Sequence, residues 1–257
     1  IGDLLQIMQC LRSEGGCPWD REQTHESIKK NLIEETYEVI EAINQQDKAL
    51  LCEELGDVLM QVVFHAQMEA EEGSFTFENV ADGVCKKLIE RHPHVFGEVE
   101  VTGSEEVLRN WDDIKKRSKG QTSQTETMLS VPRELPALMR ATKVQKKAAK
   151  VGFDWPDISG AVDKLYEETS ELSGAIESGS EEEIAEELGD LLFSAVNVSR
   201  FVGCDAEEAL TAATDKFMRR FACVEEKARE RGLKLEELSL SELDALWDEA
   251  KLDLLSK

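Results

Sequence analysis

The sequence predicts an all-α protein built from two similar halves. Apolar residues recur at the three- and four-residue spacing of a helix, alternating strand patterns are scarce, and the same acidic segments occur twice. The residues with helical spacing are Leu55, Val58, Leu59, Val62 and Ala66 in the first half, and Leu188, Leu191, Leu192 and Ala195 in the second.

Two acidic segments recur in the same order along the chain. IEETYE at 33–38 precedes EELGD at 53–57, and YEETSE at 166–171 precedes EELGD at 186–190. A constant offset of 133 (168 minus 35, 190 minus 57) relates Glu34, Glu35, Glu38, Glu54 and Asp57 to Glu167, Glu168, Glu171, Glu187 and Asp190. Smaller matches at offsets of 129 and 136 relate Lys87, Arg91, Trp111 and Lys115 to Lys216, Arg220, Trp247 and Lys251. The matching residues keep their order while the offset between the two halves changes by a few residues. This indicates a duplicated domain whose loops have changed in length.

A polar stretch separates the two halves. Residues 119–135 are rich in Ser, Thr and Gln, and Pro132 and Pro136 lie at its end. We therefore expect a first helical domain at 1–118, a linker at 119–130 and a second helical domain at 131–257.

Composition excludes several classes of protein. The formal net charge is −24, with 54 acidic and 30 basic residues, which disfavours binding to DNA, RNA or an anionic membrane. The six cysteines form no metal-type spacing, so we expect thiols in a reducing cytoplasm. We found no export signal and no apolar run long enough to span a membrane.

The spacing of the carboxylates points to a metal site. Residues three apart share a helix face, so Glu35 meets Glu38 and Glu54 meets Asp57. If two such helices pack antiparallel, four carboxylates converge and repel, and a divalent cation would remove the repulsion. Oxygen ligands without His or Cys favour Mg²⁺, with Mn²⁺ as a substitute, and Mg²⁺ keeps positions for water and phosphate.

A solvated acidic face is the alternative interpretation of a single copy. On a helical wheel, four acids of the first segment lie opposite an apolar arc. The acids are Glu34, Glu35, Glu38 and Glu41, and the arc comprises Leu32, Ile33, Ile40 and Ile43. Solvation gives no reason for the duplication, which favours the metal site.

Gly56 and Gly189 cost helix stability, and we expect close helix packing there.

The repeated basic and aromatic residues suit a nucleotide. Lys216 with Arg220, and Trp247 with Lys251, are i, i+4 pairs that offer cations to phosphates and a ring to a base. Taken alone, such pairs are more often surface ion pairs or core Trp residues, and their recurrence favours the binding role.

These motifs together resemble those of the MazG family, two-domain members of the all-α nucleoside triphosphate pyrophosphohydrolases. The resemblance rests on EETYE…ELGD, EETSE…ELGD, GCPWDREQTHESI at 16–28, RHPHVFGEV at 91–99 and GFDW at 152–155. It implies tandem helical bundles that hydrolyse NTPs and dNTPs between the α and β phosphates, giving monophosphate and pyrophosphate. It also implies Mg²⁺ and a homodimer.

The resemblance assigns roles to residues of both halves. The implied metal ligands are Glu168, Glu171, Glu187 and Asp190, with Glu35, Glu38, Glu54 and Asp57 as counterparts. The implied nucleotide-binding residues are Lys216, Arg220, Trp247 and Lys251, with Lys87, Arg91, Trp111 and Lys115 as counterparts. In the proposed chemistry Glu167, or Glu34, orients or deprotonates the water, and Glu168 and Glu171 are catalytic through the metal. The second half is favoured as the active one. Some relatives carry a Lys where Glu183 and Leu50 stand here.

Two rival interpretations belong to other classes. A di-iron protein needs repeated Glu-x-x-His, and only Glu22 with His25 has that spacing, outside the acidic segments. A non-catalytic nucleotide-sensing or protein-binding module remains open, as does a relative that acts on another nucleotide-like substrate.

Overall fold

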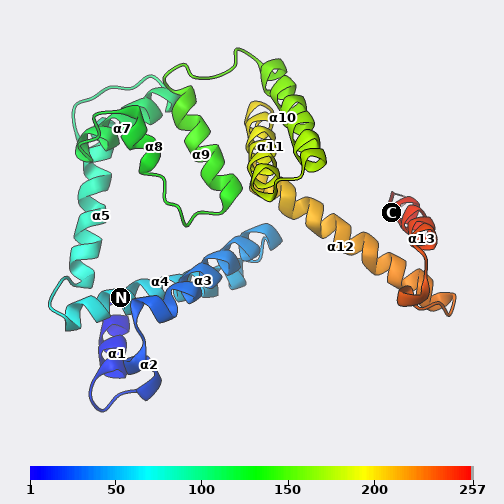
Figure 1. Cartoon of the computed structure of the whole chain (residues 1–257). Coiled ribbons are helices and arrows are strands. Elements are labelled where there is room, and N and C mark those ends of the chain that lie inside the picture. Colours follow the sequence, from blue (N-terminus) through cyan, green and yellow to red (C-terminus); the bar gives the residue numbers. More distant parts are fainter. Residues whose placement is uncertain (256–257) are drawn as a thin grey trace. The chain divides into compact units, whose positions relative to one another are not determined.

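A hairpin of two long helices forms the centre of each half of the chain (Figure 1). The computed structural model describes residues 1–255, and no strand occurs within them. The chain divides after Ser118 into two units. The helices of the first unit are α1 (Gly2–Arg12), α2 (Pro18–Glu22), α3 (His25–Gln45), α4 (Lys48–Glu71), α5 (Phe77–Arg91), α6 (Pro93–Phe96) and α7 (Ser104–Ser118).

The second unit repeats the hairpin with different flanking helices. Its helices are α8 (Gln124–Leu129), α9 (Ala137–Ala149), α10 (Ile158–Ser178), α11 (Glu181–Phe201), α12 (Ala206–Glu230), the 3₁₀ turn η1 (Leu235–Glu237) and α13 (Leu240–Leu255). The all-α prediction is confirmed. Residues 119–130, predicted to be a linker, contain α8, which packs against α9 and buries Thr127.

Both hairpins turn at equivalent positions. Helix α3 ends at Gln45, its C-cap residue Gln46 has a left-handed φ of 57°, and the Asp47 carboxylate accepts hydrogen bonds from the first turn of α4. At offset 133, Gly179 has a φ of 93° and the Ser180 hydroxyl caps α11. A left-handed residue followed by an N-cap reverses the chain in two residues. The short turn fixes the register in which the acidic segments face each other.

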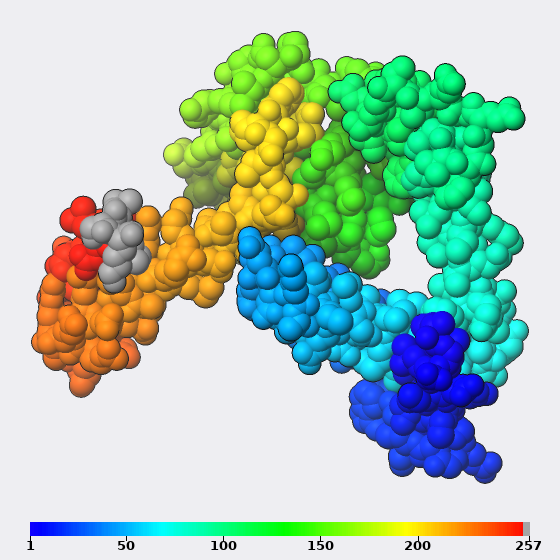
Figure 2. Space-filling view, turned by 180° about the vertical axis from the view of Figure 1, so that it is seen from behind, coloured from blue at the N-terminus to red at the C-terminus, as the bar shows by residue number. Residues whose placement is uncertain are grey.

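The first unit has its core where α1 and α3 pack on α4. Its buried residues are Met8, Ile28, Val63, Phe64 and Met68. A second core lies between α12 and α13, where Val224 and Ala228 contact Leu246 and Ala250. In the space-filling view the central part of α12 (yellow to orange) is exposed (Figure 2).

Helix α3 turns Glu35 and Glu38 toward Glu54 of α4, and it leaves an apolar stripe on its outer face. Ile33 and Ile40 are 55% and 44% exposed, and Tyr37 between them is 52% exposed. The solvated-acid interpretation predicted the opposite orientation. Their i, i+4, i+7 spacing makes a continuous apolar stripe on the outer face of the hairpin.

The expectation for the two helical glycines is wrong within this chain. A Cβ built on Gly56 or Gly189 meets nothing within 4 Å, so neither glycine is required by close packing of the described helices.

Two histidines of the first unit are in direct contact. His25 Nδ1 lies 2.7 Å from His65 Nδ1, and His25 Nε2 lies 2.8 Å from Glu69 Oε1. Burial and then the neighbouring His25 lower the pKa of His65 below 6.5. Two imidazolium rings at this distance would place donor against donor, so at least one ring stays neutral.

We predict that the first unit loses stability as the pH falls below about 6.5. Above that pH, His65 is neutral in both states, whereas below it the unfolded chain binds a proton that the folded chain resists. Denaturant unfolding between pH 7.5 and 5 should show the wild type losing stability relative to His65→Gln. Parallel pH curves for the two proteins would contradict the assignment.

Candidate functional site

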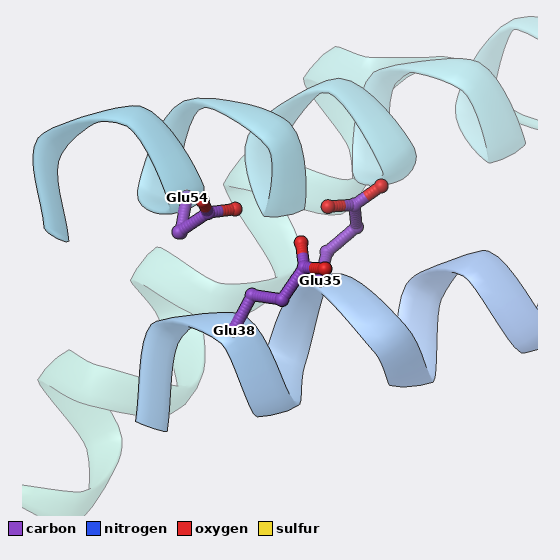
Figure 3. A group of neighbouring side chains, drawn as sticks. All are labelled: Glu35, Glu38 and Glu54. Carbon is purple, nitrogen blue, oxygen red and sulfur yellow. The ribbon is translucent and has the colours of Figure 1, made fainter. Parts of the chain in front are cut away.

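Three glutamates of the first unit converge between α3 and α4. Carboxylate oxygens of Glu35, Glu38 and Glu54 lie within 4.8 Å of one another. Figure 3 shows Glu35 and Glu38 rising from one helix toward Glu54 on the other. Glu54 is 8% exposed, so this is a partly buried group of acids rather than a solvated face. We call Glu35, Glu38, Glu54 and Asp57 the first carboxylate cluster.

Asp57 adds charge to the first carboxylate cluster from its edge. Its oxygens are outside the set that meets within 4.8 Å. Burial, then the charges of Asp57 and Glu38, raise the pKa of Glu35. Burial, then the charge of Glu38, raises the pKa of Glu54. Both shifts mean that the cluster carries unfavourable negative charge near neutral pH.

The second unit reproduces the arrangement between α10 and α11. Oxygens of Glu168, Glu171 and Glu187 lie within 4.8 Å of one another, and Glu168 is 4% exposed. Burial, then the charges of Glu171, Glu168 and Asp190, raise the pKa of Glu187. We call Glu168, Glu171, Glu187 and Asp190 the second carboxylate cluster. The offset of 133 in sequence thus becomes the same geometry in space.

Lys164 is a residue that the sequence analysis missed. Its Nζ lies 2.7 Å from Glu168 Oε1 and 2.9 Å from Glu167 Oε1, and these acids raise the pKa of Lys164. The signal was present, since Lys164 stands three and four residues before the two acids on one helix. The equivalent position of the first unit is Asn31, which carries no charge.

Gln61 is a second missed residue. It is 5% exposed, its amide hydrogen bonds to Glu35, and its Oε1 has no hydrogen-bond partner within the described residues. Buried polar atoms are rarely left unpaired in folded proteins. The carboxylate cluster and the unpaired oxygen of Gln61 offer only oxygen ligands. This set fits a site for a hard divalent cation.

The predicted water-activating acids lie at the edge of each cluster. Glu34 is exposed, and Glu167 is exposed and paired with Lys164. Neither belongs to the converging set, and the role of each stays a prediction.

The basic and aromatic residues gather around a Trp in each unit. The Arg91 guanidinium and Lys115 Nζ both lie 5.3 Å from the centre of the Trp111 ring. In the second unit, Arg220 lies 5.9 Å from the Trp247 ring, and Phe217 packs against that ring at 5.1 Å. These groups are cation–π clusters, worth ~0.5–2 kcal/mol each.

The remaining members of the predicted binding set are more exposed. Lys87 and Lys216 are exposed, and Lys251 pairs with Asp248 at 2.8 Å. In Figure 1, α13, which carries Trp247 and Lys251, packs along the part of α12 that extends away from the α10–α11 hairpin. The fold therefore brings the acids together and the cation–aromatic group together, as two separate groups.

Comparison with known proteins identifies the family. The sequence pattern of the MazG nucleotide pyrophosphohydrolase domain matches residues 23–96 and 159–224, together over half of the chain. Each match contains one complete carboxylate cluster. This chain belongs to the MazG family.

Relatives align with nearly all of this MazG chain. It is 48% identical to the nucleoside triphosphate pyrophosphohydrolase/pyrophosphatase MazG of Thermotoga maritima, over 97% of this chain and 94% of the relative. It is 46% identical to a nucleoside triphosphate pyrophosphohydrolase of Escherichia coli K12, over 98% and 97%. An uncharacterized Bacillus subtilis protein, YabN, is 50% identical over 95% of this chain and 50% of its own length.

Within residues 1–255 of this MazG protein, no helix combines the length and the apolar character that crossing a bilayer requires.

We predict that neutralising a cluster acid stabilises the metal-free protein at pH 7. The raised pKa of Glu187 means that its favourable contribution is complete below about 4.5 and is lost as the pH rises through the raised value. Glu187→Gln should therefore melt at a higher temperature than the wild type in chelator. Glu177→Gln, the same charge change at an exposed position of α10, is the control.

Divalent cation should reverse that order. At a cation concentration about 100 times Kd, binding to the folded state stabilises the wild type by ~2.7 kcal/mol per site. Glu187→Gln should lose the stabilisation that comes from cation binding at the second cluster. An unaltered Mn²⁺ response in Glu187→Gln would contradict the ligand assignment.

Proposed function

We propose that this protein is a Mg²⁺-dependent pyrophosphohydrolase that cleaves NTPs and dNTPs between the α and β phosphates. The products are the nucleoside monophosphate and pyrophosphate. The observation that carries the proposal is the pair of converging carboxylate sets, each inside a MazG domain match. The names of the Thermotoga maritima and Escherichia coli relatives support the same reaction class.

The proposed metal ligands are the two carboxylate clusters. Glu35, Glu38 and Glu54, and likewise Glu168, Glu171 and Glu187, present several oxygens to one point, with Asp57 and Asp190 at the edge. A bound Mg²⁺ would polarise the phosphate oxygens and offset the charge that develops on them. Mn²⁺ has the same preference for oxygen ligands and is proposed as a substitute.

The protein side chains hold the nucleotide and the water. We assign Lys216, Arg220, Trp247 and Lys251, with Lys87, Arg91, Trp111 and Lys115 in the first unit, to the phosphates and the base. Glu167, or Glu34, orients the attacking water or accepts its proton, while a new P–O bond forms to the water oxygen and the P–O bond that bridges the α and β phosphates breaks. Lys164 is paired with Glu167, which supports a role for this pair beside the reacting groups.

A second copy of the chain would cover the exposed apolar face of the α3–α4 hairpin. Ile33, Tyr37 and Ile40 leave an apolar stripe on α3, and Leu55 and Leu59 of α4 are also exposed. Continuous apolar surface of this kind marks an interaction site. We propose a homodimer in which α3 and α4 of two chains form a four-helix bundle.

The location is proposed to be the cytoplasm. All six cysteines are free thiols, which suits a reducing compartment.

Pyrophosphate release tests the activity. A panel of NTPs and dNTPs should give pyrophosphate and monophosphate with Mg²⁺ and none in chelator. Glu171→Ala should lower the rate by about 100-fold or more, because it removes charge that holds the metal at the reacting phosphate. Loss in Glu171→Ala alone would place turnover in the second unit, whereas loss only when Glu38→Ala is added would mean two working sites. Nucleotide binding without pyrophosphate from any substrate would favour a sensing module.

Light scattering tests the homodimer. The wild type should have twice the mass of one chain, and Ile40→Glu should shift the equilibrium toward the monomer because a charge in an apolar interface is desolvated without a partner. Lys86→Glu changes an exposed residue of α5, outside the stripe, and should leave the mass unchanged. A monomeric wild type at assay concentration would contradict the proposal.

A further inference from the structure

The two carboxylate clusters have the same acids and different neighbours. At offset 133, all four acids of one cluster match those of the other. Among the adjoining positions that do not match, Asn31 stands where the second unit has Lys164, and Gln61 stands where it has Ser194. Leu50 stands where the second unit has Glu183, which is exposed. Each of these positions lies within about one helical turn of a cluster acid.

In the second unit, a lysine already neutralises part of the cluster. Lys164 Nζ lies 2.7 Å from an oxygen of Glu168, whose side chain is only 5% exposed. A charged group at that distance from a buried carboxylate is a favourable ion pair. A divalent cation that binds Glu168 must either displace the ammonium group or tolerate its repulsion, and both cost binding free energy.

The first unit has the opposite arrangement. Asn31 supplies no charge, so no lysine at this position competes for Glu35. Gln61 supplies a buried amide oxygen that no described group pairs, on a side chain that hydrogen bonds to Glu35. Amide oxygens are ordinary ligands or water acceptors for hard cations. Ser194, its buried counterpart, has a shorter side chain and reaches less far.

We propose that the two clusters bind divalent cation with different affinities: the first cluster tightly, and the second more weakly because Lys164 competes for Glu168. The inference rests on the proposed function in taking both clusters as cation sites. It adds a division of roles between the units. The first cluster holds its ion independently of nucleotide, whereas the second gains its ion together with an anionic polyphosphate, whose charge offsets Lys164.

Mn²⁺ binding to the full-length protein tests the proposal without any activity measurement. Electron paramagnetic resonance titration of free Mn²⁺ should show two classes of site per chain, whose Kd values differ by about tenfold. Glu38→Gln should remove the tight class and Glu171→Gln the weak class.

Exchange of the residues at one equivalent position, Asn31 and Lys164, provides the decisive comparison. Lys164→Asn should tighten the weak class, and Asn31→Lys should weaken the tight class, each by about tenfold. The controls are Lys146→Asn on α9 and Asn44→Lys on α3, which make the same charge changes at exposed positions away from the clusters. Circular dichroism of each variant checks that it is folded.

The outcomes separate this inference from the function on which it rests. Two sites of equal affinity would overturn the proposed inequivalence and leave the cation-dependent activity intact. The same conclusion would follow if neither Lys164→Asn nor Asn31→Lys changed the Kd for Mn²⁺. Absence of Mn²⁺ binding at either cluster would overturn both. A weak class that tightens in Lys164→Asn while the controls stay unchanged would support the proposal.

Discussion

Repulsion between carboxylates held across a helix pair is the constraint on which the rest of this structure depends. Each hairpin places three glutamates within a few ångströms, and partial burial raises the pKa of Glu54 and Glu187 further. Such an arrangement costs folding free energy unless a cation neutralises it. The chain nevertheless builds it twice. The tight turns at Gln46–Asp47 and Gly179–Ser180 lie at equivalent positions, so both hairpins have the same register and bring equivalent acids together.

Duplication has preserved the acids and altered what surrounds them. In the first unit, Leu4 and Met8 of α1 fill the space beside α4. At offset 133 these positions are Ala137 and Ala141, and an apolar groove lies between α9 and α11. The neighbours of the clusters differ in the same way, with Lys164 in one unit and Gln61 in the other. The two units have therefore kept one chemistry while diverging in packing and local charge.

The sequence alone determined the helical class and the duplication, and it predicted the three glutamates that converge in each unit, while Asp57 and Asp190 lie outside the converging sets. These follow from short-range rules, because residues three and four apart on a helix share a face. The same rules give the pair of Trp111 with Lys115, one turn apart, whereas Arg91 and Arg220 contact Trp111 and Trp247 through the packing of separate helices. The sequence also contained the signal for Lys164, one turn before Glu168.

Only the tertiary structure decided which face of each helix is buried. A helical wheel orders residues around an axis without saying which side meets another helix, so the solvated-acid alternative placed Ile33 and Ile40 inward, whereas both are exposed. The hydrogen bond of Gln61 with Glu35 and the contact of His25 with His65 are likewise invisible in sequence, because the two residues of each pair lie 26 and 40 positions apart. The helix in the polar segment 119–130 has a local signal, because Ser123 and Glu126 form a capping box at its start, whereas its packing on α9 is visible only in the structure. Spacing along one helix is fixed by covalent geometry, whereas contact between helices depends on the packing of the whole unit.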